Sequence, residues 1–274
     1  MIKVNKDLNN IPESLIPAIE DMFEGRRIPR TSKTTHQRRI ELIENGEYID
    51  DEAYNSRYKT EDVKEKLFAL YHHKCAFCET KAEQLHVEHY RPKKGKHPYH
   101  WLAYSWDNLL LACPTCNENK GTKFEIEGQR VPPINDSSHL EYINSLSSVY
   151  NDIERPKLVN PETTEPEDSL EFTKEGKATS HNERIAYTIT TCKLDRKYLN
   201  DNRRRIFDEF KRRVTSIYVE YSDNPNFEVL ISRIIRDYIH ESQDLENEYL
   251  AFRRYTIKKR WLNDYLKEIL AQNE

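Results

Sequence analysis

The chain has 274 residues, of which 36% are hydrophobic and 33% are charged, and its formal net charge is −4. This length is enough for a buried core. The negative balance excludes a surface that is basic all over, so any nucleic-acid-binding face must be local. Six glycines in the whole chain leave few tight turns, which favours long helices over a β-sandwich or barrel.

Residues 1–59 are predicted to form an N-terminal arm with short helices. Three prolines interrupt the first 30 residues, and the first helical segment is expected from about Thr34 to Glu44, ending at Asn45-Gly46. The apolar content of this segment is thin, so we expect the arm to pack against the core or against a partner.

A second helix is predicted to begin after Thr60, where a capping residue precedes two acidic residues, Glu61 and Asp62. Apolar residues then recur at helical spacing, at Val63, Leu67, Leu70 and Tyr71. This helix leads directly to Cys75. It should therefore fix one end of the module that we place at residues 60–130.

Four of the five cysteines form two Cys-x-x-Cys pairs, Cys75/Cys78 and Cys113/Cys116. The N-terminus does not resemble a signal peptide, and no apolar run is long enough to cross a bilayer. We therefore expect a soluble protein of the reducing cytoplasm, where such pairs bind metal rather than form disulfides. Two pairs supply four thiolates, which close a tetrahedral shell, so we predict a structural zinc ion.

Between and beside the cysteine pairs lie the side chains that a metal-dependent phosphodiesterase needs. They are His86, Glu88, His89, Asn108 and Asn117. A histidine can accept a proton from water at neutral pH. A carboxylate and an amide oxygen can hold Mg²⁺ and leave positions for phosphate and water. Glu88 and Asn117 are the candidate ligands, and His89 is the candidate base.

Basic residues are concentrated in the same region, at Arg91, Lys93, Lys94, Lys120 and Lys123. We predict that they contact phosphates of DNA or RNA, although a run of charges can also be only a solvated face. The corresponding alternative function is a zinc-stabilised module that binds nucleic acid or a partner without turnover. The combination of a carboxylate, a base and an amide favours an enzyme, because binding alone needs only the basic face.

The remainder of the chain divides into an irregular linker at residues 131–179 and a helical region at residues 180–274. The linker can hold a small hairpin between Leu170–Phe172 and Ala178–Thr179. A capping box at Ser180–Glu183 opens the helical region. Apolar stripes at steps of three and four then predict several core-packed helices, the last from about Leu245 to Ile269.

Three segments together resemble the HNH, or ββα-metal, endonuclease motif: Glu88-His89, Trp106–Leu109 and Cys113–Lys120. The resemblance implies a mainly α protein with a small ββα-metal nuclease module and a structural zinc site. It also implies that His89 is the general base and that Glu88 and Asn117 bind a catalytic Mg²⁺ or Mn²⁺. Asn108 would pin the loop that connects the hairpin to the helix. The family often has Asp in place of Glu88 and His in place of Asn117. His86, on the same strand face as Glu88, is an additional candidate ligand.

Further segments resemble one group within that family, the PtuB-like nuclease subunits of Septu and retron-linked anti-phage defence systems. These segments are residues 1–15, 89–93, 101–104, 160–161 and 189–199. This resemblance implies an endonuclease that acts on DNA or, as in some retron-linked relatives, on RNA. It also implies a partner, the ABC/SMC-like ATPase PtuA, and no association with a membrane.

Overall fold

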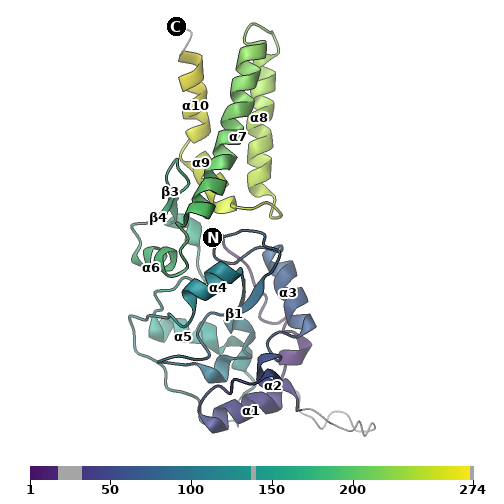
Figure 1. Ribbon diagram of the computed structural model, residues 1–274, viewed down its shortest axis with the longest axis vertical. Coiled ribbons are helices and arrows are strands. Elements are labelled where there is room, and N and C mark those ends of the chain that lie inside the picture. Colours follow the sequence, from purple (N-terminus) through teal and green to yellow (C-terminus); the bar gives the residue numbers. More distant parts are fainter. Residues whose placement is uncertain (18–32, 137–139, 272–274) are drawn as a thin grey trace.

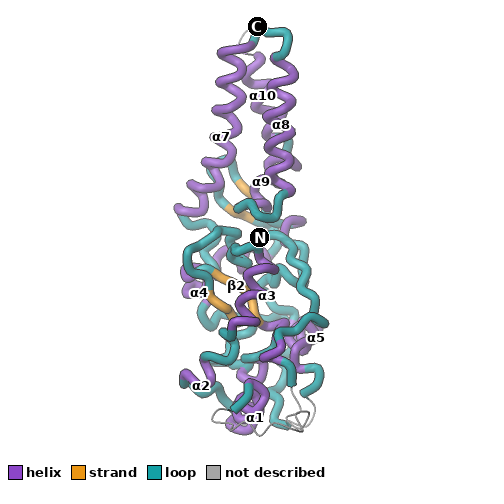
Figure 2. The backbone as a smooth tube through the Cα atoms, turned by 90° about the vertical axis from the view of Figure 1, so that its right-hand side faces the viewer, coloured by secondary structure: helices purple, strands orange, loops and turns teal. Residues whose placement is uncertain are grey.

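The computed structural model describes residues 1–17, 33–136 and 140–271 (Figure 1). The chain forms a lower body, built from its N-terminal and central parts, and an elongated helical stalk that ends near the C-terminus (Figures 1 and 2). The prediction of a mainly helical protein with a small two-stranded module is confirmed. Part of the N-terminal arm, residues 18–32, lies outside the described residues.

The arm contributes two helices, α1 (Thr35–Asn45) and α2 (Glu52–Asn55), and is followed by α3 (Glu61–Tyr71). Helix α1 begins with a capping box between Thr34 and Gln37 and ends at Gly46, whose φ of 73° suits glycine. The buried Arg39 in α1 donates to the carbonyl oxygens of Leu15 and Tyr104 at 3.0 and 2.9 Å. These bonds fasten the arm to the central module.

The central module consists of strands β1 (His86–His89) and β2 (Leu109–Ala112) and helix α4 (Pro114–Lys120). The strands are antiparallel, with His86 opposite Ala112 and His89 opposite Leu109. Every residue of β2 is buried. Helix α3 packs against β2, and α4 packs against β1. The module thus has the ββα order that the sequence resemblance implies.

The segment predicted as an irregular linker holds a helix, α5 (Leu146–Glu154), that the sequence pattern does not indicate. The fully buried carboxylate of Glu154 accepts hydrogen bonds from Arg91 and Tyr99, at 3.0 and 2.7 Å. Such distant contacts stabilise a helix whose own sequence shows no clear period. The small hairpin is present, as β3 (Glu171–Phe172) paired with β4 (Ala178–Thr179).

The C-terminal region comprises α6 (Glu183–Thr191), α7 (Lys197–Tyr221), α8 (Phe227–Gln243), α9 (Leu250–Lys258) and α10 (Trp261–Leu270). Helices α7, α8 and α10 run along the long axis and form the stalk (Figures 1 and 2). The single helix predicted from Leu245 to Ile269 is wrong, because the chain turns between α9 and α10 at Arg260, whose φ is 60°. Among the described residues, no helix is long and apolar enough to cross a membrane.

Candidate active site

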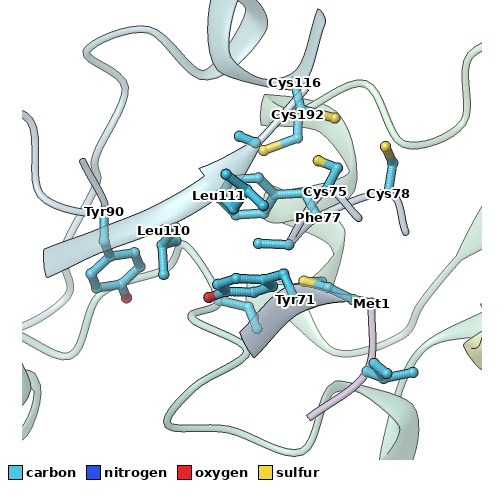
Figure 3. Packing of buried hydrophobic residues seen from close by; sticks show 14 of the residues in the cluster. Met1, Tyr71, Cys75, Phe77, Cys78, Tyr90, Leu110, Leu111, Cys116 and Cys192 are labelled. Atoms are coloured by element: carbon cyan, nitrogen blue, oxygen red, sulfur yellow. The ribbon is translucent and has the colours of Figure 1, made fainter. Parts of the chain in front are cut away.

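The four paired cysteines converge on one point. Their sulfur atoms all lie within 4.8 Å of one another, and all four side chains are buried. Cys75 and Cys78 follow α3, whereas Cys113 caps α4 and Cys116 lies in its first turn. Figure 3 shows three of these side chains beside the packed apolar residues Leu111 and Phe77. Four convergent thiolates match the ligand set of a structural zinc ion.

The cysteine cluster also lies where the stalk meets the body. The guanidinium group of Arg196, at the start of α7, donates to the sulfur atoms of Cys116 and Cys113 at 3.6 and 3.9 Å. On the other side, the backbone N–H of Lys81 donates to the carboxylate of Glu248 at 2.6 Å. A metal bound here would therefore join the segment after α3 to the start of α4, beside Arg196 at the base of the stalk.

Strand β1 and helix α4 face each other through two pairs of side chains. His86 and Glu88 alternate onto one face of β1, and Asn117 and Lys120 share one face of α4 because they are three residues apart. The Nζ atom of Lys120 donates to Glu88 Oε1 at 2.6 Å, and Asn117 Nδ2 lies 3.4 Å from His86 Nδ1. The sequence-predicted ligands are thus brought to one interface.

The carboxylate of Glu88 is buried, with 7% of the residue exposed. Burial raises its pKa, and the neighbouring Lys120 ammonium opposes that shift. Among the described residues, only the four cysteines form a convergent group of three or more His, Cys, Asp or Glu side chains. A catalytic cation at Glu88 would therefore need the amide of Asn117 or oxygen atoms of the substrate. Carboxylate and amide oxygen donors suit Mg²⁺ or Mn²⁺.

His89 is held in one defined protonation state. Its Nε2 atom donates to the carbonyl oxygen of Ala103 at 2.9 Å, so Nδ1 carries the free lone pair. Burial lowers the pKa of the imidazole well below its usual value, and the charge of Lys93 lowers it further. His89 is therefore a neutral imidazole whose Nδ1 atom can accept a proton.

Asn108 is fully buried and connects the two ends of the loop between the strands. Its Oδ1 atom accepts from the backbone N–H of Arg91 at 2.8 Å, and Nδ2 donates to the carbonyl oxygen of Leu102 at 3.1 Å. The pinned loop therefore joins β1 to β2, not the hairpin to α4 as the resemblance implies. Because Leu102 precedes Ala103, Asn108 also positions the carbonyl group that orients His89.

Residues 74–123 match the family model of the HNH endonucleases. The chain carries an HNH endonuclease domain. It is similar to the Septu protein PtuB of Bacillus mycoides (strain KBAB4), with 27% identity over 247 residues, which covers 70% of this chain and 79% of that protein. It is also similar to the Septu protein PtuB of Bacillus thuringiensis, with 29% identity over 110 residues, 38% of each chain.

A third similar protein is the Septu protein PtuA of the same Bacillus mycoides strain, with 27% identity over 173 residues. That match covers 58% of this chain and 23% of PtuA. The resemblance to HNH endonucleases and PtuB proteins predicted from sequence is confirmed, and the chain is a nuclease.

Two of the five basic residues predicted to contact phosphates are buried inside the HNH domain instead. Arg91 is fully buried, where its Nε atom donates to Glu154 at 3.0 Å and its other nitrogens donate to Ser147 and Asn151. Lys120 is also fully buried, against Glu88. Their donors are used by the protein itself, so the assignment of these two residues to nucleic acid is corrected.

The other three basic residues reach the surface of the HNH domain to different degrees. Lys93 lies between the rings of Tyr48 and Tyr58, 4.0 and 4.1 Å from their centroids, and donates to the Tyr58 hydroxyl at 2.8 Å. Burial, followed by the charge of Lys94, lowers the pKa of Lys93 to about 7. Lys94 forms an ion pair with Asp50 at 2.5 Å, and Lys123 is exposed.

The residue that sequence reasoning misses at this site is Tyr58. Its ring meets that of His89 edge to face, with centroids 4.5 Å apart and planes at 73°, and only 6% of His89 is exposed. Tyr58 comes from the segment between α2 and α3, where no periodic or motif signal singles it out. Only the folded chain brings this segment over the base.

Proposed function

We propose that this nuclease is a metal-dependent HNH endonuclease that acts as the effector of an anti-phage defence complex of the Septu type. It hydrolyses phosphodiester bonds, with DNA as the expected substrate and RNA, including tRNA, as the second candidate. The observation that carries the proposal is the state of His89: a neutral imidazole, oriented through Nε2, whose Nδ1 atom can accept a proton.

In this mechanism, Nδ1 of His89 takes the proton from the attacking water. The carbonyl oxygen of Ala103 remains bonded to Nε2–H and stabilises the imidazolium that forms. Asn108 keeps that carbonyl group in place through its bond to the adjacent Leu102. Each of these tasks is done by side chains that are already fixed by buried hydrogen bonds, so little reorganisation accompanies proton transfer.

Glu88 and Asn117, with His86 as a further candidate, would hold a Mg²⁺ or Mn²⁺ ion. The ion would neutralise charge that develops on the phosphate. Lys93, whose charge acts on His89, and its neighbour Lys94 would contact flanking phosphates once their bonds to residues 48–58 are exchanged. The zinc ion predicted at the four cysteines has a structural task.

The proposed partner is a PtuA-like ATPase of the ABC/SMC type. The relatives named PtuB and PtuA support a Septu assignment. A chain with a net charge of −4 neutralises few phosphates by itself, and affinity for nucleic acid follows that number. A partner that presents the nucleic acid to the HNH domain would supply the missing affinity.

The test is a cleavage assay with the purified chain, alone and with its ATPase partner, on DNA and on total tRNA, with Mg²⁺ or Mn²⁺. We expect metal-dependent cleavage. The His89→Ala variant should lose on the order of 10²- to 10⁴-fold in rate, as is typical when a general base is removed. Its zinc content and nucleic-acid affinity should be unchanged. A His89→Ala protein that cleaves at the wild-type rate would contradict the mechanism.

A further inference from the structure

A pocket of about 340 Å³ opens beside the proposed catalytic centre. Its polar lining comprises Tyr58, Lys59, Lys64, His86 and Asn117, and the rest of the lining is apolar. The pocket therefore reaches two of the proposed cation ligands directly, and Tyr58 separates it from His89, against which the Tyr58 ring packs.

The two lysines of this pocket differ from the other lysines around the site. Lys93, Lys94 and Lys120 each donate to a side chain of the protein. Within the described ranges, no acidic side chain forms an ion pair with Lys59 or Lys64. Two uncompensated ammonium groups in one pocket, next to a phosphodiesterase centre, favour an anion at this position.

We infer that this pocket is a subsite for a backbone phosphate of the substrate strand, which Lys59 and Lys64 bind next to the phosphate that is cleaved. This inference rests on the proposed nuclease function and deepens it. Lysine ammonium groups act as point charges, so the subsite positions the strand without selecting its sequence. Both lysines lie before the first cysteine, outside the residues that match the HNH family model.

The position of Tyr58 gives the subsite a defined relation to the base. Tyr58 lines the pocket and its ring contacts His89, so a single side chain links the proposed subsite to the proposed base. Lys59 also lies close enough to His89 for its charge to help lower the pKa of the imidazole. The proposed subsite is thus adjacent to the proposed base.

The experiment measures binding in the full-length His89→Ala background, so that cleavage does not interfere. Fluorescence anisotropy with a short labelled single-stranded oligonucleotide, of DNA and then of RNA, gives the affinity as salt rises from about 20 to 200 mM. The variants are Lys59→Gln, Lys64→Gln and the double variant. Lys267→Gln, which removes an exposed lysine of α10 in the stalk, is the matched control.

We expect the slope of log affinity against log salt to become shallower by about 0.7 for each lysine removed, because each phosphate contact with a single strand contributes about that amount. The control should keep the wild-type slope. A double variant that melts at the same temperature and keeps that slope would overturn the subsite, as would absence of binding at the lowest salt. If the lysine variants show the shallower slope but the wild-type chain cleaves neither DNA nor RNA, the result would support the subsite and count against the proposed function.

Discussion

Buried partners determine what the two neighbouring residues Glu88 and His89 can do. A carboxylate in a low-dielectric interior needs a positive neighbour, and Lys120 supplies it at 2.6 Å. An imidazole that is buried between its Ala103 hydrogen bond and the Tyr58 ring stays neutral. In the proposed mechanism, these adjacent residues on one strand have different tasks: Glu88 would bind a cation, and His89 would accept a proton.

Substitution of Glu88 should separate its role in stability from its role in metal binding. Glu88→Ala leaves the Lys120 ammonium buried without a counter-charge, which should lower the free energy of unfolding by about 3 to 5 kcal/mol. Glu88→Gln keeps an acceptor of the same size, so its loss of stability should be smaller. Both variants should require more Mn²⁺ for cleavage, and added Mn²⁺ should partly restore Glu88→Gln. Denaturant unfolding and a metal titration of cleavage measure the two effects.

The control for Glu88 is Glu125→Gln, which removes the carboxylate of a more exposed ion pair with Lys157, at 3.3 Å. Its effect on stability should stay within about 0.5 kcal/mol, and its metal requirement should not change. If Glu88→Ala matched the wild-type protein in both unfolding and Mn²⁺ titration, neither role of Glu88 would hold.

At the scale of elements, local signals predict those that carry the site. The Thr34 cap and Gly46 predict where α1 begins and ends. The two Cys-x-x-Cys pairs predict a metal site formed from both sides of the β1–β2 hairpin. The contacts that change the functional assignment lie far apart along the chain. Arg91 is buried because Glu154, 63 residues later, forms an ion pair with it. No local pattern indicates such a contact, and the same holds for the cover that Tyr58 forms over His89.

The cysteine cluster leads to a prediction about the whole HNH domain. We expect about one zinc ion per chain, and Cys113→Ser should unfold the domain rather than only slow cleavage, because metal-binding energy is folding energy in a small site. Serine can still cap α4 in place of Cys113, so the expected loss of folding reports on the metal and not on the helix start. Elemental analysis and circular dichroism on the purified variant measure zinc content and folding.

Cys192→Ala is the matched control, because it removes a fully buried thiol that is not among the four converging sulfur atoms. This variant should keep its zinc and remain folded. Folded, active wild-type protein that contains no zinc would refute the assignment of the cluster.

The molecule as a whole combines a small catalytic domain with a long projecting stalk (Figure 1). Large apolar side chains are exposed on both sides of the turn between α7 and α8. Val219 is 75% exposed and Val229 is 64% exposed. The stalk end lies far from the HNH domain in Figures 1 and 2, so substrate binding does not account for these residues. Burial of exposed apolar groups can stabilise a protein–protein contact, so we propose this end of the stalk as the docking surface for the partner.

The last prediction therefore concerns the partner. When the chain and its PtuA-like ATPase are co-expressed, they should co-purify and elute together from a sizing column. The double variant Val219→Asp/Val229→Asp should weaken this association, because burying a charge at an interface without a partner is costly. Its own stability should change little, since both side chains are exposed.

Tyr142→Asp, at a 70% exposed aromatic residue on the body, is the control and should leave the complex intact. If the wild-type chain elutes alone in this test, the proposed partnership with the ATPase is refuted. If the wild-type chain binds the ATPase and the stalk variant binds it equally tightly, the partner docks elsewhere on the chain.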